Sequence, residues 1–332
     1  MDDTSVSAYN PEEDIHPLML KRGGMKLKQA LLFLANKVLE SSVFPMSCKL
    51  DHKILLEKAM RASYNMCKSY RPITLESIIG KLVQRMMRIR LEWHLESSNL
   101  LSITQEAYRK DRNCNDLMLR LVQSIQEGWN RGETTVLCIF DFSSYFESVW
   151  RERLICKLYE AGVKGRMLRL FHDYISNRKF RLVVNKFTTE WTESSIGTPQ
   201  GGILSTIATN VYSSDSDASD IFSHGEFSDD NLKWVSNASE LEALQQLQCR
   251  VDAFISWCGE HNISHSLDKI KLMVFRPPTS PRPYRQLSLR IGMDLVNEVD
   301  MYKILGTLVK NDLDFDMHFE EAIKKHMLLF ML

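Results

Sequence analysis

The feature that most constrains the fold is a short run of β-branched and apolar residues that ends in a carboxylate. Residues 134–140 read Thr-Thr-Val-Leu-Cys-Ile-Phe, and Asp141 follows directly. An apolar run of this length without alternation is typical of a strand that is buried on both faces. We therefore expect a central strand at 134–140 that presents Asp141 at its end.

A second group of carboxylates lies in a predicted turn. Asp229 and Asp230 stand between two strand candidates, at 221–227 and 232–235. Carboxylates at strand ends and hairpin tips are held rigidly and can converge, and three converging carboxylates need a partner such as a divalent ion bound through oxygen. Such a site suits phosphoryl transfer, although an acidic turn by itself is more often only solvated.

A glycine-rich loop lies between these two carboxylate sites, at 197–202, with the sequence G-T-P-Q-G-G. Three glycines around a proline give a backbone that can approach a ligand closely, and the side chain of Gln200 can hydrogen-bond a base or a sugar. The alternative is an ordinary turn before the next helix.

Helical periodicity alternates irregularly with short strand-like runs along the chain, which favours an α+β fold over a doubly wound sheet. Helices are predicted at 26–41, 75–96, 115–130, 150–161, 164–176, 203–212 and 238–259, and further strands at 180–184, 189–194, 272–275 and 304–309, with a turn at 185–186.

Charge is balanced in total but not along the chain, which has 42 basic and 42 acidic residues. Residues 151–186 hold ten bases and three acids, whereas residues 212–242 hold eight acids and one base. Opposed blocks suit a protein that grips phosphates with one surface and holds cations with another, although both blocks could be solvated faces. No apolar run could span a membrane, and seven cysteines without a C-x-x-C pair indicate reduced thiols inside a cell.

Seven short motifs, each weak alone, occur in one order along the chain. They are Y-R-P-I-T-L at 70–75 with Gly80-Lys81-Leu82, Q-E-A-Y-R-K at 105–110, D-F-S-S-Y-F-E-S-V-W at 141–150, G-T-P-Q-G-G-I-L-S at 197–205, F-S-D-D-N-L-K-W-V-S at 227–236, L-D-K-I-K-L-M-V-F at 267–275 and Leu305-Gly306. Over residues 26–330 the sequence thereby resembles the reverse transcriptases of non-LTR (LINE-like) retrotransposons, with jockey-type elements the most similar.

The resemblance implies an α+β fold of the right-hand type, with an antiparallel, ferredoxin-like palm sheet packed on helices. It implies fingers at 26–132, a palm at 133–310 with fingers elements interleaved at about 150–195, and the start of an incomplete thumb at 311–332. The acidic residues 1–25 lack periodicity and are expected to form a disordered leader.

The resemblance also implies roles at the carboxylates. Asp141, Asp229 and Asp230 would hold two Mg²⁺ ions, with Mn²⁺ as a possible substitute, and the carbonyl of Phe142 would be a further ligand. Lys269 would protonate or neutralise the pyrophosphate leaving group, unless it is only an exposed lysine at a strand edge.

Nucleotide and template contacts are implied elsewhere. Phe146 is similar to the aromatic gate that excludes a ribose 2′-hydroxyl, with a core aromatic as the alternative. Arg71 and Arg109 would clamp phosphates, unless they form ion pairs that stabilise the fold. The remaining implied residues are Gly197, Pro199, Gln200 and Gly201 beside template and nucleotide, and Leu305 and Gly306 in the primer grip.

The implied function is RNA-directed DNA synthesis, with an RNA template, a DNA primer and deoxynucleoside triphosphates as partners, no membrane, and action in cytoplasm and nucleus. We expect the chain to be a piece of a longer element protein that also has endonuclease and thumb regions. Residues 50–66 contain no glycine or proline, and Asp111 stands where the family usually has glycine. These departures leave open a decayed, truncated remnant that only binds nucleic acid, or a structural domain without a ligand.

Overall fold

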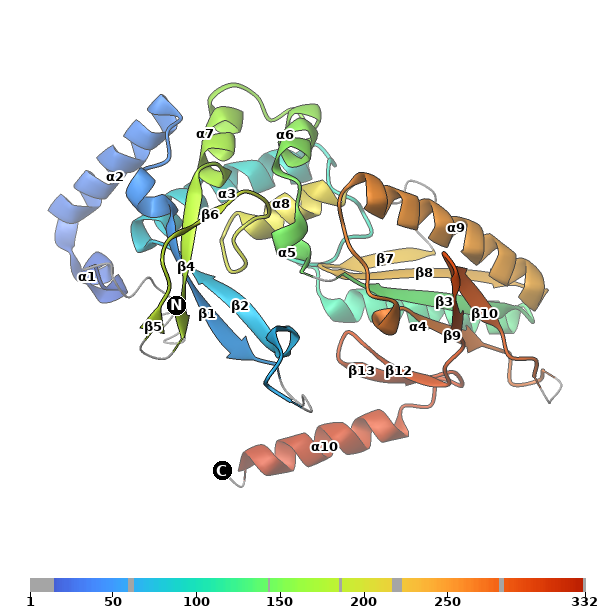
Figure 1. Cartoon of the computed structure of the whole chain (residues 1–332). Coiled ribbons are helices and arrows are strands. Elements are labelled where there is room, and N and C mark those ends of the chain that lie inside the picture. Colours follow the sequence, from blue (N-terminus) through green and yellow to red (C-terminus); the bar gives the residue numbers. More distant parts are fainter. Residues whose placement is uncertain are drawn as a thin grey trace. The chain divides into compact units, whose positions relative to one another are not determined.

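The computed structural model describes residues 15–58, 63–142, 144–184, 187–216, 223–280 and 284–330 (Figure 1). The chain divides into two compact units, and each unit is built from two separate stretches of sequence. The first unit comprises residues 1–101 and 146–213, and the second comprises residues 102–145 and 214–332. The one-turn helix α5 (Tyr145–Ser148) lies where the chain returns to the first unit.

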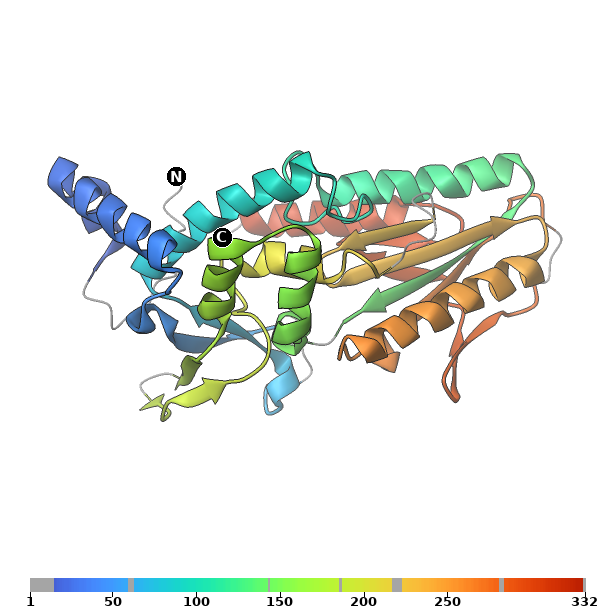
Figure 2. The same cartoon turned by 90° about the horizontal axis from the view of Figure 1, so that it is seen from above.

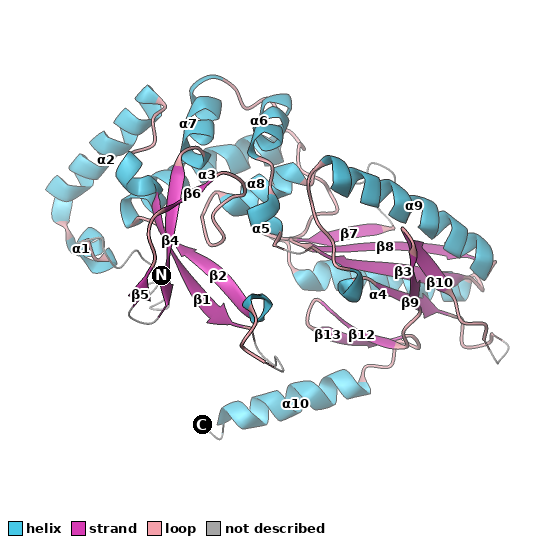
Figure 3. Cartoon of the chain, in the orientation of Figure 1, coloured by secondary structure: helices cyan, strands magenta, loops and turns pink. Residues whose placement is uncertain are grey.

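The first unit is a mixed sheet accompanied by helices (Figure 3). Its strand order is β2-β1-β4-β5, and β6 also pairs with β4. Strand β1 runs antiparallel to β2 and parallel to β4. The elements of this unit are β1 (Leu50–Glu57), β2 (Tyr70–Leu75), β4 (Arg178–Val184), β5 (Phe187–Thr188), β6 (Thr192–Ser194), α1 (Pro17–Arg22), α2 (Gly24–Ser41), α3 (Ile78–Ser97), α6 (Arg151–Glu160), α7 (Gly165–Ile175), α8 (Ser205–Tyr212) and the 3-10 turns η2 (Met46–Lys49) and η3 (Cys67–Ser69).

Helix α3 illustrates how the sequence builds this unit. Ser77 caps its first turn by accepting a hydrogen bond from the Gly80 N–H. Its buried side chains recur every four residues, which turns one stripe of the helix toward the core. That stripe consists of Val83, Met87, Leu91 and Leu95.

The second unit is built on a four-stranded antiparallel sheet of order β7-β8-β3-β9. Figure 2 shows α4 and α9 on opposite faces of this sheet. The elements are β3 (Thr134–Asp141), β7 (His224–Phe227), β8 (Asp230–Asn237), β9 (Lys271–Phe275), α4 (Cys114–Asn130), α9 (Glu240–Glu260), the 3-10 turn η4 (Leu267–Lys269), the hairpins β10 (Ser288–Ile291) with β11 (Asp294–Asn297) and β12 (Met301–Ile304) with β13 (Thr307–Lys310), and α10 (Asp316–Phe330).

Strand β3 is central and buried on both faces, as its uninterrupted apolar run predicts. Leu137 and Ile139 join the core cluster that α4 supplies on one face. Phe140 points to the other face, where its ring lies 5.0 Å from that of Phe254 in α9. The structure therefore confirms the predicted central strand, with Asp141 as its last residue.

Several sequence-based expectations differ from the structure. The strand predicted at 304–309 is wrong, because β12 and β13 form a hairpin whose turn is Leu305-Gly306. Strand β1, in the segment that lacks glycine and proline, and the β10–β11 hairpin were not predicted. The turn predicted at 185–186 and the first two residues of the strand predicted at 221–227 lie outside the described residues.

The predicted domain limits differ from the two units as well. Helix α4, which lies within the predicted fingers, packs on the sheet of the second unit, where Leu117, Leu121 and Ile125 complete the core. Of the predicted leader 1–25, residues 1–14 lie outside the described part, and Pro17–Arg22 forms α1. No helix among the described residues is both long and apolar enough to cross a membrane.

Candidate active site

Three carboxylates gather at one end of the central sheet of the second unit. Asp141 ends β3 and is the register partner of Asp230, the first residue of β8. Asp229 precedes it in the turn, and its carbonyl accepts a hydrogen bond from the Phe142 N–H at 3.3 Å. The strand pairing thus brings together residues that are almost ninety positions apart in sequence.

These carboxylates repel one another in a largely buried setting. Burial, followed by the charges of Asp229 and Asp141, raises the pKa of Asp230 to about 7. Burial also raises the pKa of Asp229, and the charge of Asp141 adds to that effect. Lys269 opposes the repulsion, since its Nζ lies 2.7 Å from Asp141 Oδ1. The predicted general acid therefore contacts the first of the predicted catalytic carboxylates.

The donor chemistry of this cluster fits a hard divalent cation. Carboxylate oxygens are preferred ligands of Mg²⁺, and a cation would relieve the repulsion that raises the pKa values of Asp229 and Asp230. Within the described ranges, no three His, Cys, Asp or Glu side chains stand ready as a ligand set. In this arrangement the Lys269 ammonium supplies the positive charge at Asp141.

A cavity of about 470 Å³ borders two of the carboxylates. It is lined by Asp141 and Asp230 and also by the Leu305-Gly306 turn, so the structure joins the predicted primer grip to the carboxylate cluster. Both turn residues have left-handed backbones, with φ of 48° at Leu305 and 89° at Gly306. Tyr302 is a cavity residue that sequence reasoning missed, because only the hairpin fold turns it toward the carboxylates.

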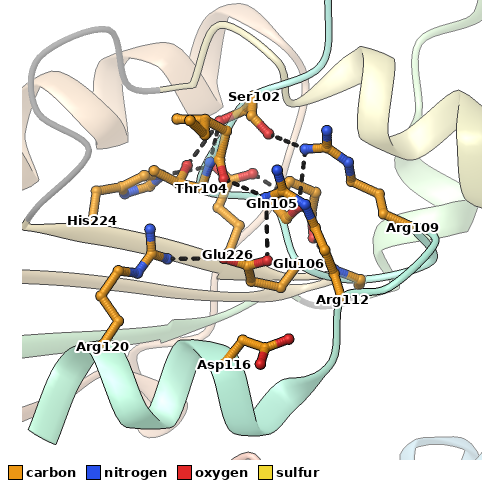
Figure 4. A network of polar contacts seen from close by, with 12 residues as sticks. Ser102, Thr104, Gln105, Glu106, Arg109, Arg112, Asp116, Arg120, His224 and Glu226 are labelled. Atoms are coloured by element: carbon orange, nitrogen blue, oxygen red, sulfur yellow. Dashed lines mark hydrogen bonds and ion pairs between the residues drawn. The ribbon is translucent and has the colours of Figure 1, made fainter. Parts of the chain in front are cut away.

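Figure 4 shows a polar network in the same unit, on the segment that contains the Q-E-A-Y-R-K motif. The Arg109 guanidinium donates to the carbonyls of Ser102, at 2.6 Å, and Gln105, at 3.3 Å. These contacts tie the Arg109 side chain to the backbone of its own segment. Asp111 has a φ of 58°, a left-handed conformation that explains why glycine suits this position and that aspartate tolerates.

The glycine-rich loop and Phe146 come together in the first unit. The N–H of Thr198 donates to the carbonyl of Phe146 at 2.7 Å, and the N–H of Gly197 donates to the carbonyl of Val149 at 2.9 Å. Gly197 has a φ of 76°, and a Cβ there would lie 2.6 Å from the carbonyl oxygen of Glu147. The loop therefore packs on the chain that carries Phe146 so closely that only glycine fits at this point.

The other side of the loop rests on β2. The carbonyl of Gln200 accepts a hydrogen bond from the Thr74 N–H at 2.8 Å. Gly201, with a φ of 104°, would bring a Cβ within 3.2 Å of the Thr74 carbonyl oxygen. Pro199 lies in the same loop, and Arg71 lies in β2 with an exposed side chain. The predicted nucleotide and template residues thus lie in the first unit, except for Arg109 and Phe142, which lie in the second.

Arg151 holds this loop in place, a role that sequence reasoning missed. Its buried guanidinium donates to the carbonyls of Gly197, at 2.8 Å, and Ile196, at 3.0 Å, and to the Ser194 hydroxyl at 2.8 Å. Burial lowers the pKa of Arg151 to about 10. The only sequence signal at Arg151 is its place among the ten bases of 151–186, and a count of bases does not separate buried from exposed charges.

The basic block is therefore only partly a surface. Arg151, Lys157 and Arg178 are all buried. Lys157 donates to the Tyr212 carbonyl, and Arg178 pairs with Asp51 at 2.6 Å and with Glu76 at 2.9 Å. These three bases serve the interior of the first unit, whereas Arg153 and Arg166 of the same block are exposed.

Comparison with known proteins gives consistent results. A sequence model of the family described as reverse transcriptase (RNA-dependent DNA polymerase) matches residues 56–309. The chain is 25% identical over 302 residues to an RNA-directed DNA polymerase from the mobile element jockey of Drosophila melanogaster, covering 87% of this chain and 32% of that protein. It is 23% identical to a probable RNA-directed DNA polymerase from transposon X-element of the same species, covering 88% and 32%.

A likeness in structure accompanies the likeness in sequence. The fold is similar to that of apo telomerase from Candida tropicalis truncated from the C-terminal domain, with a TM-score of 0.55 and 10% identity. The match covers 87% of this chain and 60% of that one, and at this identity it bears on the fold alone. The chain spans about a third of the length of the curated relatives it matches.

Proposed function

This chain belongs to the reverse transcriptase (RNA-dependent DNA polymerase) family, and on that premise we propose that it is the polymerase part of a jockey-type non-LTR retrotransposon protein. It extends the 3′-hydroxyl of a DNA primer along an RNA template by adding deoxynucleotides. The observation that carries the proposal is the register pairing of Asp141 with Asp230, beside Asp229 and at the edge of a cavity.

Members of this family use divalent metal ions, and here Asp141, Asp229 and Asp230 would hold them. The raised pKa values of Asp229 and Asp230 support this assignment, because a bound cation stabilises the ionised carboxylates. When bound, two Mg²⁺ ions supply charge stabilisation for the attacking and leaving oxygens of an in-line displacement at phosphorus. The Phe142 carbonyl is proposed as a further ligand.

Lys269 and the Leu305-Gly306 turn act on the leaving group and on the primer end. Lys269 holds a proton on Nζ, 2.7 Å from Asp141, and gives it to the departing pyrophosphate. The cavity that Asp141 and Asp230 share with the Leu305-Gly306 turn supports a role for that turn in seating the primer end.

Selection of the nucleotide is proposed to lie with the first unit. Phe146 excludes a ribose 2′-hydroxyl by steric overlap. The residue is half-buried, and the glycine-rich loop fixes its backbone through the hydrogen bond from the Thr198 N–H to the Phe146 carbonyl. Gln200, with Gly197, Pro199 and Gly201, contacts template and nucleotide, and Arg71 binds phosphates from its exposed position on β2.

Extension measured together with binding tests the proposal. The protein is incubated with an oligo(dT) primer on a poly(rA) template, Mg²⁺ and dTTP, and complex formation with the same duplex is measured in parallel. We expect both binding and extension. Binding without extension would instead support a remnant that only grips nucleic acid, a reading that the family match through all three carboxylates does not favour.

A further inference from the structure

The turn that carries Asp229 and Asp230 is braced by a buried carboxylate next to it in the chain. Glu226 is 2% exposed. Its Oε1 accepts hydrogen bonds from His224 Nε2 at 3.0 Å, from Asn231 Nδ2 at 3.1 Å and from the Ser216 hydroxyl. Such a set of donors keeps a buried carboxylate ionised and fixed in one orientation.

One side chain connects this carboxylate to the turn. Gln105, which is 1% exposed, donates from Nε2 to Glu226 Oε2 at 3.1 Å. Its Oε1 accepts hydrogen bonds from the N–H groups of Ala107, at 3.0 Å, and Ser228, at 3.1 Å. Because Glu226 accepts only, it fixes which end of the Gln105 amide faces Ser228.

The backbone around Gln105 reinforces this link. The Glu226 N–H donates to the Thr104 carbonyl and the Glu106 N–H donates to the Glu226 carbonyl, both at 2.9 Å, so that residues 104–106 run along β7 as a short parallel bridge. Glu106 in turn pairs with Arg112 at 3.2 Å and Arg120 at 3.5 Å (Figure 4). Residues 104–106, which carry Gln105, are therefore fixed by contacts that do not involve the Gln105 side chain.

The conformation that Gln105 contacts is an unusual one. Ser228 has a φ of 61°, which is the left-handed region that a serine rarely adopts. Its hydroxyl lies 3.0 Å from that of Tyr108, a second contact from the same segment. Asp229 and Asp230 follow directly, so any change in the Ser228 backbone redirects both carboxylates.

We propose that Gln105 is a positioning residue whose amide, oriented by Glu226, holds the Ser228 N–H and so fixes the turn that aims Asp229 and Asp230. The inference rests on the proposed function, since it assigns a support for the proposed catalytic carboxylates. Residues that orient metal-binding side chains usually change metal affinity 10- to 100-fold when replaced. A purely structural glutamine would alter stability without this effect.

The test compares Gln105→Met with Gln248→Met. Gln248 is a matched control because its amide also makes a two-way bridge, from α9 to β10: its Oε1 accepts from the Arg290 N–H at 2.9 Å, and its Nε2 donates to the Arg290 carbonyl at 2.7 Å. Two readouts are independent of catalysis: hydrogen exchange of the peptide 225–232, and Mn²⁺ binding followed by electron paramagnetic resonance. Gln105→Asn provides a milder variant that keeps an amide too short to bridge Glu226 and Ser228.

For Gln105→Met we expect at least tenfold faster exchange of the Ser228 and Asp229 amides and about tenfold weaker Mn²⁺ binding. Gln105→Asn is expected to change the exchange rate and the Mn²⁺ affinity in the same direction. Gln248→Met is expected to change neither quantity. If a folded Gln105 variant had the same amide exchange rates and the same Mn²⁺ affinity as the wild type, the inference would be overturned. Failure of the wild type to extend a primer would contradict the proposed function instead, while exchange and Mn²⁺ binding would still decide the role of Gln105.

Discussion

Asp141 and Asp230 are opposite one another in the last pair of the β3–β8 ladder. Directly paired residues in an antiparallel sheet have Cα atoms about 4.5–5.5 Å apart, so this register alone brings two like charges into each other's field. A pair of this kind destabilises a sheet unless a cation or a proton compensates it.

Replacement of Lys269 tests its proposed role as the proton donor. Lys269→Met is expected to lower kcat by about 10²-fold, because the leaving pyrophosphate loses its acid, with little change in the KM for dTTP. The matched control is Lys271→Met, two positions along the chain from Lys269. It removes a lysine that donates a hydrogen bond to the Asp268 carbonyl. Equal kcat values for both variants would refute the role.

Phe146→Ala is expected to relax discrimination against ribonucleotides. Removal of the ring leaves space for the 2′-hydroxyl, and the ratio of kcat/KM for dTTP over UTP should fall about tenfold or more. Phe187→Ala, which truncates a phenylalanine that is 82% exposed in the same unit, should leave the ratio unchanged. A ratio unaffected by Phe146→Ala would make this ring a packing residue.

Gly197→Ala is expected to destabilise the first unit by about 1–3 kcal/mol, since the new Cβ meets the Glu147 backbone in a left-handed conformation. Gly259→Ala, in α9 with open space around the Cβ, should have no such cost. Urea unfolding followed by circular dichroism measures the difference. Equal midpoints for the two variants would show that the loop adapts.

Arg151→Met separates internal from external bases. It removes the guanidinium donors to the carbonyls of Gly197 and Ile196 and should cost about 1–3 kcal/mol of stability. Arg153→Met, at an exposed position of the same helix, should leave stability unchanged but reduce the salt dependence of duplex binding. The reverse pattern would mean that Arg151 belongs to the binding surface.

Local patterns were sufficient to predict the parts of the fold that local chemistry dictates. The apolar run before Asp141 predicts a buried strand, and helical periodicity locates α3, α4 and α9 to within a few residues. Strand β1 was not predicted, because its parallel partner β4 lies more than 120 positions away and its own sequence does not alternate. The apolar pattern at 304–309 predicts a single strand across the Leu305-Gly306 turn, because a leucine with a left-handed backbone has no signature in sequence.

The supports of the candidate site were harder to predict than its carboxylates. Asp141, Asp229 and Asp230 stand at a strand end and a turn, where the sequence predicts that carboxylates can converge. Glu226 and Arg151 are charges that the fold buries, and in a sequence they are indistinguishable from solvated neighbours. Only the three-dimensional structure reveals which groups they bind, namely neighbouring side chains for Glu226 and carbonyls of the glycine-rich loop segment for Arg151.

The most direct test of the account is primer extension on poly(rA)–oligo(dT) with Mg²⁺ by the wild type, Asp229→Ala and Asp294→Asn. Asp294 is an exposed aspartate of β11 and serves as the control. We expect extension by the wild type and by Asp294→Asn, and a loss of at least 10³-fold in Asp229→Ala with duplex binding retained. Extension that persists at the wild-type rate in Asp229→Ala would contradict it.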